Sequence, residues 1–235
     1  MPFEDVTIVL AHGAWADGSS WARVIQALAA DGIRAVAPQL PLTSLHDDVA
    51  ALERAIERVP GPVILAGHAY AGAVIAATQS DQVKALVYVA ALAPDAGETV
   101  ADVFYRTAPH PQAPKLLPDD HGLIYLPDAA FGTAFAQNAA AEDLAVLAAV
   151  QRPISPACIT VAVPRPLWRE RPSWFLVAED DRMIAPDNQR FMAERMQARV
   201  RSSAVDHLPI VTAPSVVLAV LHEARAAVRS AGAAL

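Results

Sequence analysis

The sequence predicts an α/β protein, with a mainly parallel sheet flanked by helices and a helical lid inserted into it. Three observations support this prediction. Apolar strands alternate with amphipathic helices over residues 1–93 and again over residues 167–235, a rhythm that produces parallel strands joined by right-handed crossovers. Over residues 94–166 the rhythm stops and prolines cluster. Near residue 67, a strand passes into a helix of small residues almost at once. We therefore divide the chain into a core, 1–93 and 167–235, and a lid, 94–166.

The first part of the chain supplies strands and helices in strict alternation. Apolar, β-branched runs predict strands over residues 6–10 and 33–37. The first helix takes Ser19 or Ser20 as its N-cap, and the second takes Ser44. Both helices carry apolar residues at helical spacing: Trp21, Val24, Ile25 and Leu28 in the first, and Leu45, Val49, Leu52, Ile56 and Val59 in the second.

The remaining strands are short apolar runs bounded by turn residues. They are predicted over residues 63–66, 84–91, 173–178 and 198–205. Two further core helices are expected, over residues 186–197 and from Pro214 onwards. Within the lid, helical patterns occur only in pieces, near residues 129–137 and 141–150.

Composition limits the classes of function. Hydrophobic residues make up 54% of the 235 residues and charged residues 18%, as in a compact folded chain. The net charge of −7 argues against a nucleic-acid partner, which requires a basic surface. No apolar run approaches the roughly 20 residues that span a bilayer. The N-terminus shows no basic region followed by a cleavable apolar segment, so we expect a cytoplasmic protein. Cys158 is the sole cysteine, which excludes an intrachain disulfide and a cysteine metal cluster.

The central strand and helix meet in a motif that carries chemistry. Residues 67–71 read GHAYA and have the form of a nucleophile elbow, written G-x-S-x-G. So abrupt a turn forces its central residue into a strained backbone conformation, and Gly67, Ala71 and Gly72 are small enough for the crowding. The position of the attacking serine holds Ala69. The pattern predicts acyl-transfer machinery without its nucleophilic oxygen.

Acyl transfer through a covalent intermediate also needs a base and a group that orients the base. Elbow-type enzymes present nucleophile, acid and histidine in this order, each just after a strand. This chain follows the same order, with position 69 first, then the pair Asp180 and Asp181, and then His207. We assign the general base to His207. Asp180 and Asp181 compete for the orienting role, and Asp95 is a third candidate.

The loop after the first strand predicts the oxyanion hole. In elbow-type enzymes, one backbone N–H comes from this loop and the other from the residue after the nucleophile. The loop contains His12, Gly13 and Ala14. The two expected donors are therefore the amides of Ala14 and Tyr70.

Four stretches carry a specific resemblance: LAHGAWADGSSW, ILAGHAYAGAV, LVYVAALAPDAGETV and FLVAEDDRMIAPDNQRFM. They resemble the α/β-hydrolase superfamily, in its bacterial esterase-like branch related to plant methylesterases and hydroxynitrile lyases. The similarity covers nearly the whole chain and is weakest in the lid. It implies the α/β-hydrolase fold and a small-ester hydrolase without cofactor or metal. It selects Asp181 over Asp180, because the acid of the relatives immediately precedes a basic residue, and it places their histidine at His207. The relatives have serine where this chain has Ala69, and the motif prefers glycine at Ala71.

We therefore expect an esterase-like protein with a Ser-His-Asp type of site at positions Ala69, Asp181 and His207. As written, it should lack ordinary serine esterase activity. Alanine at position 69 is either an engineered replacement or a natural loss of serine. Two other functions remain open: a cofactor-free lyase or oxygenase that uses His207 as general base, and a non-catalytic small-molecule receptor. A ligand that is consumed would favour the first over the second.

The expected ligand is small, uncharged and largely apolar. This follows from the absence of a basic cluster and from the apolar residues near the predicted site. No nucleic acid or membrane is expected as a partner, and a homodimer is compatible with the sequence. The side chains expected to contact the ligand are Trp15, Phe104, Tyr125, Trp168 and Leu208.

Overall fold

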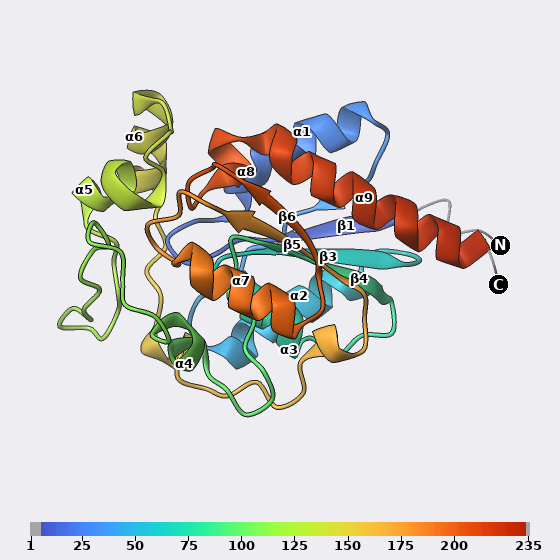
Figure 1. Cartoon of the computed structure of the whole chain (residues 1–235), viewed down its shortest axis with the longest axis horizontal. Coiled ribbons are helices and arrows are strands. Elements are labelled where there is room, and N and C mark those ends of the chain that lie inside the picture. The colour runs from blue at the N-terminus through green and yellow to red at the C-terminus, as the bar shows by residue number, and fades with distance from the viewer. Residues whose placement is uncertain (1–5, 234–235) are drawn as a thin grey trace.

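A computed structural model describes residues 6–233, so residues 1–5 and 234–235 of the predicted core lie outside the described residues. The described chain forms a six-stranded sheet in the order β2-β1-β3-β4-β5-β6, and every neighbouring pair is parallel (Figure 1). The predicted fold class, a parallel sheet flanked by helices, is confirmed. The strands are β1 (Thr7–Ala11), β2 (Ala35–Val36), β3 (Val63–His68), β4 (Val83–Val89), β5 (Ser173–Ala178) and β6 (Arg199–Ser203).

Two strands, β2 at the edge of the sheet and β3 at its centre, differ from the sequence prediction in opposite directions. A strand was expected over residues 33–37, but only the two residues of β2 pair with β1. Pro38 follows almost directly and has no N–H to continue a ladder. In contrast, β3 continues past the predicted residue 66 to His68, because it is paired on both sides, with β1 and with β4. The sheet therefore extends furthest at the centre, where the elbow lies.

Helices cover both faces of the sheet. Figure 1 shows α1 and α9 on one side and α2, α3 and α7 on the other. Ser44 caps α2 as predicted, because its Oγ accepts a hydrogen bond from the N–H of Asp47 at 3.0 Å. The core helices are α1 (Ala22–Ala30), α2 (Leu45–Glu57), α3 (Ala71–Ala77), α7 (Pro186–Arg195), α8 (Pro209–Thr212) and α9 (Pro214–Ala233).

The cap expected for the first helix is wrong. Neither Ser19 nor Ser20 caps it, because both lie inside a 3₁₀ turn, η1 (Gly18–Trp21), that precedes α1. The cap of that turn is Asp17, whose Oδ1 accepts from the N–H of Ser19 at 2.8 Å. Asp17 has the short side-chain acceptor that this position requires.

Between β4 and β5 the chain forms short helices and loops. Within the described residues, the segment 94–166 contributes isolated β-bridges but no strand of the sheet. Figure 1 shows α4, α5 and α6 together at one end of the sheet. We keep residues 94–166 as the proposed lid. Its elements are α4 (Val100–Phe104), α5 (Asp128–Ala130), a π-helical turn (Phe131–Phe135), α6 (Ala141–Ala149) and η3 (Pro156–Cys158), and η4 (Leu167–Arg169) leads into β5.

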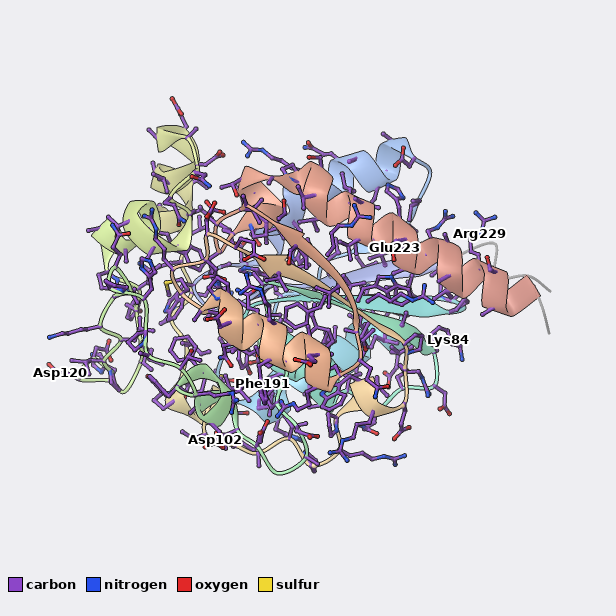
Figure 2. The ribbon with its side chains drawn as sticks, in the orientation of Figure 1. Lys84, Asp102, Asp120, Phe191, Glu223 and Arg229 are labelled. Carbon is purple, nitrogen blue, oxygen red and sulfur yellow. The ribbon has the colours of Figure 1, made fainter. Side chains whose placement is uncertain are left out.

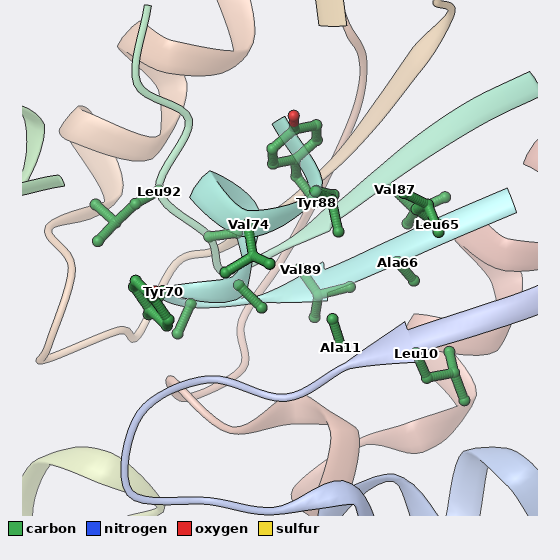
Figure 3. Close-up of a cluster of buried hydrophobic side chains, with 14 of the residues drawn as sticks. Leu10, Ala11, Leu65, Ala66, Tyr70, Val74, Val87, Tyr88, Val89 and Leu92 are labelled. Atoms are coloured by element: carbon green, nitrogen blue, oxygen red, sulfur yellow. The ribbon is translucent and has the colours of Figure 1, made fainter. Parts of the chain in front are cut away.

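The hydrophobic core follows the two central strands. Leu65 and Ala66 of β3 and Val87 and Val89 of β4 are buried, and Figure 3 shows them side by side. Charged side chains such as Asp120 lie at the periphery (Figure 2). None of the helices among residues 6–233 has the length and apolar character needed to cross a bilayer.

Candidate active site

The turn between β3 and α3 has the backbone of a nucleophile elbow. Ala69 has φ 51°, in the left-handed region that costs a non-glycine residue energy. The turn is also crowded. A Cβ on Gly67 would lie 2.7 Å from the carbonyl oxygen of Ala71, and one on Gly72 would lie 2.3 Å from that of Leu92. The small residues of the motif are therefore required by close contacts between backbone segments.

His207 lies at the end of the sheet with its imidazole held by one acid. Its Nδ1 is 2.8 Å from Oδ2 of Asp181, and both side chains are buried. Because both oxygens of Asp181 already accept hydrogen bonds from other donors, Nδ1 of His207 is the donor to Oδ2 and carries the ring proton, and Nε2 is left as the basic nitrogen. This is the arrangement in which a carboxylate fixes the tautomer of a general base.

Asp181 itself is held by the turn after β5 and by α7. Its Oδ1 accepts from the N–H groups of Met183 at 2.7 Å and Ile184 at 2.9 Å. The side-chain amide of Gln189 donates to Oδ2 at 2.7 Å. The sequence analysis missed Gln189, since its contact with the acid arises only when α7 packs against β5. Four donors thus hold this buried carboxylate in place.

The other two candidate acids do not contact His207. Asp95 forms an ion pair at 2.7 Å with Arg169, whose side chain is exposed. Asp180 contributes its backbone carbonyl, which accepts from the side chain of Gln137 at 2.7 Å. Among the three acids considered, the structure brings only Asp181 to the imidazole.

Two further buried histidines form hydrogen bonds with backbone groups next to the site. Leu40 donates its N–H to Nε2 of His12 at 2.9 Å, so Nδ1 of His12 carries the proton and donates to the carbonyl of Gly13 at 2.9 Å. Nε2 of His68 donates to the backbone carbonyl of His207 at 2.7 Å. Burial lowers the pKa of His12 to about 4 and that of His68 well below its ordinary value, so both are neutral at pH 7. The sequence predicted neither contact.

The two expected oxyanion donors lie beside the elbow. Ala14 and Tyr70 line the same cavity as Ala69 and His207. Among the described residues, neither the Ala14 nor the Tyr70 backbone N–H donates to a protein acceptor. Figure 3 shows Tyr70 near Leu92, where the central strands end. Two free amides next to the nucleophile position are what oxyanion stabilisation requires.

The cavity above Ala69 encloses about 660 Å³, including its opening to solvent. Its wall is almost entirely apolar, and its only titratable side chains are those of His207, Tyr70 and Tyr105. The lid supplies much of the wall. The lining residues are Ala14, Trp15, Ala69, Tyr70, Leu92, Val100, Ala101, Phe104, Tyr105, Leu116, Ile124, Ile154, Ile159, Met183, Ile184 and His207.

Two of the five predicted ligand contacts, Trp15 and Phe104, line this cavity. The other three do not. Tyr125 is 46% exposed and lies outside the wall, next to Ile124, whose side chain lines the cavity instead. Trp168 is buried, with its indole N–H donating to the carbonyl of Pro94 at 3.0 Å. Leu208 is fully buried in the hydrophobic core.

No group of three or more His, Cys, Asp or Glu side chains within residues 6–233 has the arrangement of a metal site. The geometry thus consists of a buried acid–imidazole pair, two free amides and an alanine at the sharp turn. These groups match the positions of an acyl-transfer site with one atom missing.

Comparison with known protein families identifies the family of this chain. A model of the alpha/beta hydrolase family matches residues 8–220, and the chain belongs to this family. No curated protein matched the chain significantly.

Several solved structures that share the fold are named as esterases or hydrolases. Polyneuridine aldehyde esterase superposes with a TM-score of 0.81 at 17% identity, over 94% of this chain and 99% of that chain. The pyrethroid hydrolase PytH gives 0.78 at 23% identity, over 93% and 96%. A methylesterase from Arabidopsis gives 0.76 at 16% identity, over 94% and 99%. At these identities the comparisons establish the shared fold alone.

Proposed function

We propose that the chain is an esterase-like member of the family whose site takes a small, neutral, largely apolar ester and lacks only the nucleophilic hydroxyl. The observation that carries the proposal is the buried pair of Asp181 and His207, whose imidazole lines the same cavity as the strained Ala69. Acyl transfer uses all of these features together: a strained turn that presents residue 69, a histidine with a fixed tautomer, and two free amides beside the acyl carbon under attack.

The chemistry follows from the position of each group. With serine at position 69, Nε2 of His207 would take the hydroxyl proton as the oxygen attacks the ester carbonyl. Asp181 would stabilise the imidazolium that forms, and the amides of Ala14 and Tyr70 would bind the tetrahedral oxyanion. With alanine, no acyl-enzyme forms, and only binding and the oxyanion hole remain to accelerate hydrolysis.

The class of ester follows from the wall of the cavity. No Lys, Arg, Asp or Glu side chain lines it. A charged substituent would lose its hydration there without gaining a partner. Aliphatic and aromatic residues would bury an apolar acyl or alcohol group.

The test is the restoration of the hydroxyl. Ala69→Ser adds one small oxygen at a turn whose backbone is already formed, and short-chain p-nitrophenyl esters should be hydrolysed at least ~10²-fold faster than by the chain as written. Ala69→Ser/His207→Ala should lose the gain. Ala77→Ser, the same substitution at the last residue of α3, is the matched control and should show no gain.

If Ala69→Ser folds normally and hydrolyses none of a broad panel of esters, the proposal is wrong. A compound consumed by the unmodified chain in a reaction that needs His207 would then indicate lyase-type chemistry. A compound bound and recovered unchanged would indicate a receptor.

A further inference from the structure

A second buried carboxylate lies behind the elbow, outside the catalytic groups described above. Asp48 on α2 is fully buried. Its Oδ1 accepts from the backbone N–H of Leu42 at 2.7 Å. Its Oδ2 accepts from the hydroxyl of Tyr70 at 2.7 Å and is 3.6 Å from Sγ of Cys158. One carboxylate thus collects three donors, and none of them is a cation.

The three donors come from three different segments of the chain. Tyr70 belongs to the elbow, Cys158 to η3 of the lid, and Leu42 to the loop before α2. Leu42 has φ 59°, and its carbonyl accepts from the N–H of the lid residue Ser155 at 2.9 Å. Asp48 therefore joins the residue after the nucleophile position to the lid that covers it.

The electrostatics of the cluster keep its two side-chain donors protonated at neutral pH. Burial raises the pKa of Asp48, while the hydrogen bonds from Tyr70 and Leu42 oppose that rise. Burial also raises the pKa of the Cys158 thiol to about 12 and that of the Tyr70 phenol well above its ordinary value. Both side chains therefore remain protonated donors. Burying a carboxylate without a cationic partner costs desolvation free energy, and apolar residues could fill the same space without that cost.

We propose that Asp48 is a positioning residue for the oxyanion hole. Tyr70 contributes its backbone N–H to the expected oxyanion site and its ring to the wall of the cavity. With its phenol fixed by Asp48 and its backbone fixed by the elbow, Tyr70 is held at both ends, so its amide keeps one direction relative to residue 69. This inference rests on the proposed function, because the amide has a catalytic use only if residue 69 carries a nucleophile.

The kinetic test uses Ala69→Ser as background. Adding Asp48→Asn or Tyr70→Phe should lower kcat roughly tenfold, a fraction of the cost of losing an oxyanion donor outright, and KM should stay within about twofold. The double variant should lose little more than either single one, since both remove the same hydrogen bond. Asp47→Asn, the same substitution at the exposed neighbouring position, is the control and should leave kcat unchanged.

A second readout needs no catalysis and uses the chain as written. The protein has four tyrosines, so labelling with ¹⁵N-tyrosine gives four amide signals. The signal missing from Tyr70→Phe identifies residue 70. Asp48→Asn should shift or broaden this signal more than the other three, and Asp47→Asn should not.

The two readouts separate the two proposals. If Ala69→Ser has no ester activity, the proposed function is rejected, and the Tyr70 amide signal decides the role of Asp48 alone. An unchanged Tyr70 amide in Asp48→Asn overturns the positioning role. So does an unchanged kcat in Ala69→Ser/Asp48→Asn, or effects of the two substitutions that multiply. If Asp48→Asn fails to fold, Tyr70→Phe, which removes only the hydroxyl, carries the kinetic test.

Discussion

Two regions border the cavity, and each contains a buried carboxylate. The base side consists of Asp181 and His207; the elbow side consists of Ala69, Tyr70 and Asp48. On the base side, the carboxylate binds directly to a side chain that lines the cavity. On the elbow side, it binds to the far end of Tyr70, behind the wall.

The difference shows how a buried acid obtains its role. Asp181 accepts one hydrogen bond from the general base, so its charge acts on the atom that would move a proton. Asp48 accepts only from neutral groups, and none of them would transfer a proton. In the proposed site, the first acid would therefore act electrostatically on the reaction, and the second would act through geometry. With Ala69 at the central position of the elbow, both arrangements are complete in the structure.

The largest expected effect tests the base side. In the Ala69→Ser background, Asp181→Asn should abolish nearly all of the gained esterase activity, at least ~10²-fold in kcat, because an amide no longer stabilises the imidazolium or fixes its tautomer. Steady-state hydrolysis of p-nitrophenyl esters measures this loss. Asp180→Asn, one residue away, should retain the activity. Equal losses in the two variants would contradict the assignment of Asp181.

The next largest expected effect is a loss of stability in acid. It comes from His12, which forms a hydrogen bond within the loop that contains Ala14. Its pKa is about 4 in the folded chain and 6.5 when exposed. Between these values the unfolded chain binds a proton that the folded chain does not. The free energy of unfolding therefore falls as pH falls from 6.5 towards 4, by about 3 kcal/mol from this group.

Urea unfolding at pH 7 and pH 4 measures the loss. His12→Gln retains an acceptor for the N–H of Leu40 but does not titrate, so its loss between the two pH values should be smaller by that amount. His46→Gln, at an exposed position, should behave as the unmodified chain does. If His12→Gln and the unmodified chain lose equal stability, His12 is not buried in its neutral form.

The smallest effect is spectroscopic and tests the elbow side. Cys158 is the sole cysteine, so its S–H stretching band in the infrared has one source. The thiol and the Tyr70 hydroxyl share Oδ2 of Asp48. Tyr70→Phe should leave that oxygen to the thiol and move the band to lower frequency. Asp48→Asn should weaken the bond and move the band to higher frequency. Bands that stay in place in both variants would mean that the thiol is not part of the cluster.

The sequence by itself determined the succession of strands and helices along the chain and the chemistry of the elbow. Alternating apolar strands and amphipathic helices specify a parallel sheet locally, because each pattern has its own period. Gly67 and Gly72 encode the sharp turn, since any larger residue would meet backbone there. Ser44 as the cap of α2 was equally local.

Only the tertiary structure decided the contacts between residues that lie far apart in the chain. Gln189 reaches Asp181 because α7 packs against β5. His68 reaches the carbonyl of His207 across 139 positions, and Asp48 meets Cys158 across 110. Tyr125 and Trp168 look alike in sequence, as aromatic residues of or near the lid, yet one is exposed and the other is buried away from the cavity. The direction of a side chain depends on how separate segments pack, and a local pattern contains no record of that packing.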